Sequence, residues 1–210
     1  MAKLFYITCD LKSVEDSPSL LVANEFLNEY MKWNPQDEIR SLDLYRDYIQ
    51  RIDTDVLSGN EKINLGHAFV ALTDDEQRKI SRIWRLADQF IDADKYVFAT
   101  PRWTICYPAE FKIYIDSICL RGKTFEITPE GPRGLLKAEE KKCLHIHTVN
   151  GTFSEKHESY TTSYFNYIMN FMGIKNIESI VIQNGEGHSE QSERTIIGAL
   201  RRAKTMARDF

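Results

Sequence analysis

Short apolar runs alternate with longer amphipathic segments along the whole chain. The runs Lys3–Thr8, Tyr96–Ala99, Lys141–Thr148 and Ile177–Ile182 are too short for helices and are rich in strand-forming residues. The continuous apolar stretch from Leu4 to Ile7 is typical of a strand buried on both faces of a parallel sheet. Asp37–Leu42 is a fifth candidate strand, and its charges favour a place at an edge.

Between these runs, apolar residues recur at helical spacing. Ser17 followed by Pro18 predicts a capped helix start, and Thr73 with Glu76 forms a capping box before an amphipathic segment. Pro108 stands where the first turn of a helix tolerates proline. Two further helices are predicted over Tyr164–Met172 and from Ile196 onward.

Two connections are longer than the rest. Asp43–Gly66 has weak periodicity and predicts an extended connection with one short helix; a connection of this length is usually functional. Thr124–Leu136 contains two prolines and two glycines and predicts an excursion with a short hairpin.

The alternation of strands and helices predicts an α/β fold with right-handed crossovers. Five strands of this kind fit a flavodoxin-like three-layer sandwich, a parallel sheet of order 2-1-3-4-5. The length of 210 residues favours one domain over residues 1–210.

Composition excludes several classes. A net charge of −4 gives no reason to expect the basic surface that binds nucleic acid. The sequence contains no apolar run of about 18 residues, the length that a membrane-spanning helix needs. The amino terminus is typical of a first strand rather than a signal peptide. Four widely spaced cysteines without a C-x-x-C pair predict reduced thiols in a cytoplasmic protein.

Three loops are predicted at one edge of the sheet. They are Cys9–Ser19, Pro101–Ile105 and Thr148–Gly151, each directly after a strand, where open α/β sheets bind ligands. A serine-capped helix after a strand and a polar loop also makes an anion site, because its first N–H groups have no partner within the helix. The alternative is that Ser17 is only a helix cap.

A longer string around the second loop carries a family resemblance. The chain resembles the FMN-dependent NADH:azoreductases, within the flavodoxin-like NAD(P)H:quinone reductases. The matching residues are Ala99, Pro101, Arg102–Ile105, Pro108, Phe111–Lys112, Tyr114, Asp116 and Gly122–Phe125, with further matches at Asp43–Tyr45, Ala93–Tyr96 and Gly131–Leu136.

The resemblance implies a set of cofactor-binding residues. Ser17 and Ser19 match the two serines that hold the FMN phosphate. The flavin ring would be bound by residues of the other two loops: Pro101, Arg102, Trp103, Thr104, Ile105, Thr148, Asn150 and Gly151. Trp103 keeps the family's aromatic residue, whereas Arg102 and Thr104 replace an apolar residue and an asparagine, and Asn150 replaces a glycine.

Two further residues match positions in the substrate pocket of the family. Phe171 matches an aromatic residue that lines the pocket in the dimer, and its alternative is ordinary core packing. Ile127 stands where the family often has tyrosine.

The activity implied by the resemblance is a two-electron transfer. NADH or NADPH reduces bound FMN, leaves, and a quinone or azo compound then takes the electrons in a ping-pong order. The cofactor carries this chemistry, so no catalytic side chain is required. The family is homodimeric, and each partner completes the other's pocket.

Two other functions compete with this one. The first is a flavin-free protein with a binding or regulatory role. It is motivated by the altered residues of the flavin loops and by Asp10, Glu15 and Asp16, which crowd the proposed phosphate loop with only Lys12 to oppose them. A flavodoxin-like electron carrier is less favoured, because a minimal carrier needs neither of the two long connections.

Cys143, His145 and His147 share one face of a predicted strand, which makes a metal site a second possibility there. Zinc sites need at least three suitably spaced ligands, and the sequence shows no third ligand at a useful spacing from the two histidines. Packed or partly exposed histidines are the favoured interpretation. The common hydrolase, metalloprotease and nucleoside triphosphate motifs do not occur in the sequence.

Overall fold

A computed structural model describes the backbone of residues 1–104, 106–136, 141–150, 155–184 and 190–210. Side chains at 150, 155–159 and 184 lie outside this description. A parallel sheet of five strands forms the centre in the order β2-β1-β3-β6-β7, which is 2-1-3-4-5 when only its own strands are counted. The predicted fold class is therefore confirmed. The strands are β1 (Lys3–Thr8), β2 (Glu38–Asp43), β3 (Lys95–Thr100), β6 (Lys142–Asn150) and β7 (Asn176–Asn184).

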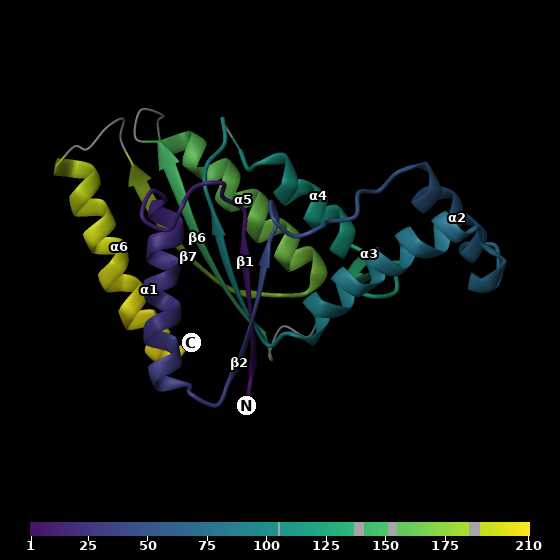
Figure 1. Ribbon diagram of the computed structural model, residues 1–210, viewed down its shortest axis with the longest axis horizontal. Helices are drawn as coiled ribbons and strands as arrows, with labels where there is room; N and C mark the ends of the chain where they lie inside the picture. Colours follow the sequence, from purple (N-terminus) through teal and green to yellow (C-terminus); the bar gives the residue numbers. More distant parts are fainter. Residues whose placement is uncertain (105, 137–140, 151–154, 185–189) are drawn as a thin grey trace.

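Helices cover both faces of the sheet (Figure 1). One face carries α1 (Pro18–Trp33) and α6 (Glu190–Asp209), and the other carries α3 (Asp74–Asp92), α4 (Ala109–Ile118) and α5 (Glu155–Met172). The short helix α2 (Thr54–Asn64) packs on α3 at the end of the molecule opposite to α6, and a 3-10 turn, η1 (Phe69–Ala71), follows it. Within the described residues, none of the helices has the length and apolar character that crossing a bilayer requires.

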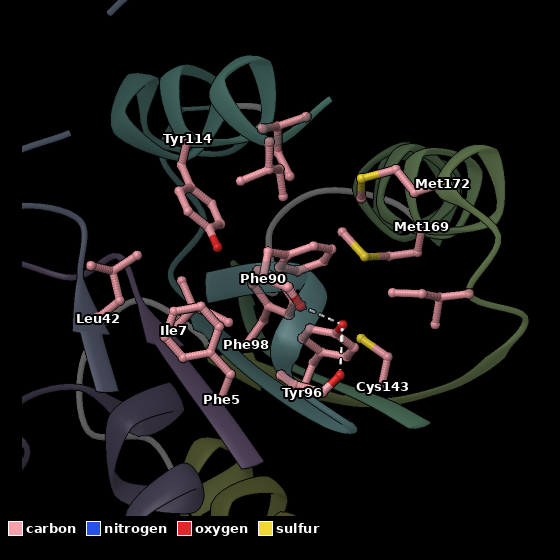
Figure 2. Close-up of a cluster of buried hydrophobic side chains, with 14 of the residues drawn as sticks. Phe5, Ile7, Leu42, Phe90, Tyr96, Phe98, Tyr114, Cys143, Met169 and Met172 are labelled. Carbon is pink, nitrogen blue, oxygen red and sulfur yellow. Dashed lines mark hydrogen bonds between the residues drawn. The ribbon is translucent and has the colours of Figure 1, made fainter. Parts of the chain in front are cut away.

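The sheet separates two hydrophobic cores. Side chains alternate along each strand, so Val97 and Ala99 face α1 and α6, whereas Tyr96 and Phe98 face α4 and α5. Figure 2 shows the second core between the sheet, α4 and α5. Its buried Tyr96 hydroxyl donates to the carbonyl oxygens of Phe90 and Ala93, at 2.7 and 3.1 Å, so this polar group is satisfied inside the core.

Most predicted element boundaries are confirmed. Ser17 accepts a hydrogen bond from the Leu20 N–H, and Thr73 with Glu76 forms the predicted capping box. Two helix starts were wrong: α5 begins at Glu155 rather than Tyr164, and α6 begins at Glu190 rather than Ile196, because the first turns of both helices are polar in sequence and show no apolar stripe. Pro108 is the residue before α4 rather than part of its first turn.

Both long connections have the predicted content. The connection after β2 contains α2 as its one α-helix, and α2 is fixed to α3 through Glu76. The Glu76 carboxylate accepts from Ser58 Oγ and Lys62 Nζ, both at 2.7 Å. The excursion contains the antiparallel hairpin of β4 (Phe125–Thr128) and β5 (Gly131–Gly134).

Candidate functional site

The three predicted loops leave the sheet along one edge. Strands β1, β3 and β6 are neighbours and run in the same direction, so their carboxyl ends lie side by side. The Cys9 N–H donates to the Ala99 carbonyl oxygen at 3.1 Å, and Thr100 pairs with His147 in register. The loops after β1, β3 and β6 therefore begin next to one another, as a binding site at this edge requires.

The amino end of α1 carries a buried hydroxyl pair. Ser17 Oγ and Ser19 Oγ lie 3.1 Å apart, and both residues are buried. Ser17 Oγ also donates to Asp10 Oδ2 at 2.6 Å. An ionised carboxylate only accepts, so the single proton of Ser17 goes to Asp10 and Ser19 is the donor in the serine pair.

This network gives the two predicted phosphate-binding serines different roles. The Ser17 hydroxyl is committed to Asp10 and caps α1 through the Leu20 N–H, whereas the Ser19 hydroxyl can turn to a ligand. Asp10 also accepts from the Lys12 N–H at 3.0 Å and is buried, while Glu15 and Asp16 are exposed. Among the acids near this loop, the charge of Asp10 is therefore the one that solvent screens least from a ligand bound at the start of α1.

The loop after β3 contains a tight turn. Trp103 and Cys106 exchange two backbone hydrogen bonds, at 2.9 and 3.1 Å. Thr104 has a φ of 58°, an uncommon conformation for a β-branched residue. The Trp103 side chain is 54% exposed, and Arg102 Nε donates to the Thr104 carbonyl oxygen at 3.0 Å. The Arg102 guanidinium is thus bonded to its own loop, and Ile105 lies outside the described residues.

The third predicted loop, Thr148–Gly151, is wrong in its first three residues, because Thr148 to Asn150 belong to β6 and pair with β7. Thr148 is buried at the end of β6, and its Oγ1 has no hydrogen-bond partner among the described residues. Buried hydroxyls are normally bonded, so Thr148 offers a donor and an acceptor to a ligand at this edge. Asn150 ends β6, but its side chain, like the whole of Gly151, is outside the description.

Two stacked histidines lie beneath this edge. The rings of His145 and His147 are 4.5 Å apart between centroids, and His145 Nε2 is 2.9 Å from Thr100 Oγ1. Both residues are buried, and burial lowers the pKa of His147 to about 4 and that of His145 well below its usual value. No group of three or more possible metal ligands occurs within the part of the chain that is described, so packed neutral histidines fit the observations.

The two predicted substrate-pocket residues lie together but away from this edge. Phe171 contacts Phe125 of β4, with ring centroids 4.7 Å apart, and Ile127 on the same strand is 53% exposed. Because α5 runs back along the sheet from the edge, Phe171 lies about 24 Å along the helix axis from its start. Within one chain, these residues do not join the cofactor loops.

One contact at the site was not foreseen from the sequence. The Tyr107 hydroxyl donates to the Thr161 carbonyl oxygen at 2.8 Å and so fixes the end of the second loop to α5. A tyrosine between a cysteine and a proline has no periodicity, and the contact spans 54 positions along the chain. No local pattern in the sequence indicates it.

The arrangement suits a phosphorylated ligand with hydrogen-bonding ring atoms. A helix amino end with a hydroxyl in its first turn binds phosphate through dipoles and hydrogen bonds rather than through cations. The unpartnered Thr148 hydroxyl lies at the end of β6, two strands along from the loop that carries Ser19. The hydrogen-bond donors at this edge therefore fit FMN. The Asp10 carboxylate opposes FMN binding, because its negative charge repels the phosphate.

Comparisons with known proteins show the family of the chain. The model of a protein family with a flavodoxin-like fold matches residues 2–206. The FMN-dependent NADH:quinone oxidoreductase of Geotalea uraniireducens is 51% identical over 210 residues, which is the full length of both chains. The chain belongs to this flavodoxin-like family. The predicted resemblance is therefore confirmed.

Solved structures of this flavodoxin-like family have the same fold. A crystal structure of an azoreductase from Bacillus anthracis superposes with a TM-score of 0.88 at 30% identity, and all of each chain is covered. An FMN-dependent NADH-azoreductase from the same organism, solved in complex with FMN, gives 0.86 at 26% identity and covers 99% of this chain and 98% of its own. The likeness thus covers essentially the whole length of each chain.

Proposed function

We propose that this protein is an FMN-dependent oxidoreductase that uses NADH to reduce quinones or azo compounds. The observation that carries the proposal is the full-length identity of 51% to an FMN-dependent NADH:quinone oxidoreductase. The geometry supports it, because a helix amino end and an unpartnered buried hydroxyl occur along one edge of the sheet.

The residues at this edge have distinct parts in the proposed site. Ser19 and the first turn of α1 hold the phosphate, while Ser17 and Asp10 keep that turn in shape. The backbone of Pro101–Thr104 lies along the ring, and the Thr148 hydroxyl bonds to one of its polar atoms. When bound, FMN would accept a hydride from NADH and then pass two electrons to the quinone or azo compound, in a ping-pong order.

We infer that two copies of the chain form the complete site. Support comes from the separation of Phe171 and Ile127 from the cofactor loops of their own chain. It also comes from exposed aromatic residues on α5, since Tyr160 and Tyr167 are 65% and 70% exposed. A second copy packed on this face brings its Phe171 and Ile127 to the flavin loops.

The four cysteines are free, which supports a place in the reducing cytoplasm. Reduced thiols are the rule in that compartment. Proteins in oxidising compartments more often pair their cysteines.

A titration of the purified apoprotein with FMN tests the proposed function. We expect saturable binding with one FMN per chain, followed by NADH oxidation when a quinone is added. Ser19→Ala should weaken FMN binding about tenfold or more, because it removes a hydrogen bond to a charged group. The matched control is Ser13→Ala on the same loop, whose hydroxyl donates to Asp16 at 2.9 Å on the surface.

A second candidate function is a flavin-free binding protein, which the buried Asp10 carboxylate beside the phosphate turn favours. The same titration separates the two. Failure to bind FMN would support the flavin-free function. Binding of FMN without quinone-dependent NADH oxidation would instead support an electron carrier.

A further inference from the structure

A second pocket lies away from the flavin edge, between three elements. It has a volume of about 480 Å³, within the range of small-molecule sites. Its walls come from α2, from Trp84 on α3 and from the turn after α4. The main lining residues are Asn60, Ile63, Asn64, Trp84, Leu120 and Arg121.

The position of this pocket separates it from the flavin site. The turn containing Leu120 and Arg121 follows the carboxyl end of α4, whereas Pro101–Tyr107 precedes its amino end. The ten residues of α4 span about 15 Å. A ligand in this pocket therefore binds without touching the cofactor loops.

The walls of the pocket are held in place by charged and packed contacts. Lys79 of α3 bonds to Asp53 and Asp55 at the start of α2, at 2.6 and 2.5 Å. Gly59 of α2 is buried against Ile80 and Glu76 of α3. The pocket is thus preformed, and binding need not order it.

The chemistry of the lining selects a ligand class. Trp84, Ile63 and Leu120 provide an apolar wall for a flat ring, and the side-chain amides of Asn60 and Asn64 provide polar groups. The Trp84 indole itself packs on Phe69, with ring centroids 5.3 Å apart, and has Lys123 Nζ 5.8 Å from its centroid, so only the part that these neighbours leave open faces the pocket. Arg121 is exposed and has no ion-pair partner among the described residues. Its planar guanidinium matches a carboxylate with two hydrogen bonds.

The charge balance favours a single negative charge. Lys123, the other cation of the lining, is paired with Asp88 on α3. A phosphate ester carries nearly two charges and would meet only one uncommitted cation. We infer that this pocket binds a small aromatic monocarboxylate, independently of FMN and of the proposed function.

The test is a calorimetric titration of the FMN-loaded protein with 2-naphthoate. We expect one site per chain, at least about tenfold weaker binding of neutral 2-naphthamide, and no change in the flavin absorbance. Arg121→Gln should weaken 2-naphthoate binding by a similar factor and Arg121→Lys by less. Arg201→Gln is the matched control, since Arg201 is exposed on α6 across the sheet.

Other results would overturn the inference. One is the absence of binding at millimolar 2-naphthoate, and another is equal affinity of Arg121→Gln and the parent chain for 2-naphthoate. A third is a change in the flavin spectrum on adding 2-naphthoate that an added quinone abolishes, because it would place the ligand at the flavin. Trp84→Leu gives an independent measure, because it removes the ring surface and leaves Arg121 in place. Unchanged binding by that folded variant would also contradict the proposed site. Melting curves establish that each variant is folded.

Discussion

At the scale of single residues, Asp10 is the residue whose charge opposes the proposed cofactor. Its buried carboxylate bonds to Ser17 and lies by the turn that would hold a phosphate. We expect Asp10→Asn to lower the Kd for FMN about three- to tenfold, because it removes a like charge and keeps an oxygen that accepts from Ser17. Fluorescence titration with FMN measures this.

The control for this prediction is Asp16→Asn. Asp16 is exposed on the same loop, so solvent and salt screen its charge and the Kd should change less than about twofold. Weaker FMN binding by Asp10→Asn would mean that the carboxylate is needed to orient Ser17, contrary to our expectation.

His147 gives the fold an expected sensitivity to acid. Its pKa is lowered by burial to about 4, whereas in the unfolded chain it titrates near 6.5. Between these values the unfolded state binds more protons, so stability falls as the pH drops from about 6.5 to 4 and is unaffected above that range. The loss from this group is about 3 kcal/mol.

Urea unfolding at several pH values measures this loss. We expect a shallower pH dependence in His147→Gln, which removes the titrating ring, and an unchanged one in His67→Gln, because His67 is exposed. Parallel profiles for His147→Gln and the parent chain would show that the acid sensitivity arises elsewhere.

The location of the proposed site residues was more predictable than their orientation. The family resemblance implied Ser17, Ser19 and Thr148, and each stands at or just after the carboxyl end of a strand, where neighbouring strand ends share an edge. Whether Asp10 points inward depends on its bond to Ser17, seven positions away, which no periodicity encodes. The left-handed conformation of Thr104 was likewise unpredictable, since threonine rarely adopts it.

At the scale of elements, the end of α5 depends on Gly173. This glycine has a φ of 106°, and the Ile174 N–H after it donates to the Met169 carbonyl oxygen at 2.9 Å. An added Cβ would run into the Leu136 carbonyl oxygen. We expect Gly173→Ala to lower the free energy of unfolding by about 3 kcal/mol, since strain and a backbone clash combine.

Gly122 provides a matched comparison for this substitution. Its φ is 80°, but an added Cβ meets nothing within 4 Å. Gly122→Ala should therefore cost only the conformational strain, about 1 kcal/mol. Equal losses in the two variants, measured by urea unfolding, would contradict a role for the Leu136 contact.

The strength of local signals decided which elements were predictable. The capping box at Thr73 and the proline after Ser17 gave two helix starts correctly, because caps depend on a few adjacent residues. The start of α5 had no such signal, and its polar first turns read as loop.

At the scale of the whole molecule, the proposed cofactor should stabilise the fold. FMN at about 100 times its Kd contributes about 2.7 kcal/mol, which raises the Tm of a chain of this size by roughly 5–10 °C. Riboflavin lacks the phosphate and should give a much smaller shift at equal concentration. Equal shifts for the two ligands would contradict phosphate binding at the start of α1.

The different exposure of the four cysteines allows the loop after β3 to be labelled selectively. Cys106 is exposed in the turn beside Trp103, whereas Cys9 and Cys143 are buried and Cys119 is half-buried. Burial raises the pKa of Cys9 and of Cys119 to about 12, so their nucleophilic thiolate forms are scarce near neutral pH. A maleimide fluorophore should thus attach once per chain, at Cys106, and report ligand arrival without any engineered cysteine. The same selectivity makes this turn the first part of the protein that a mild oxidant would modify.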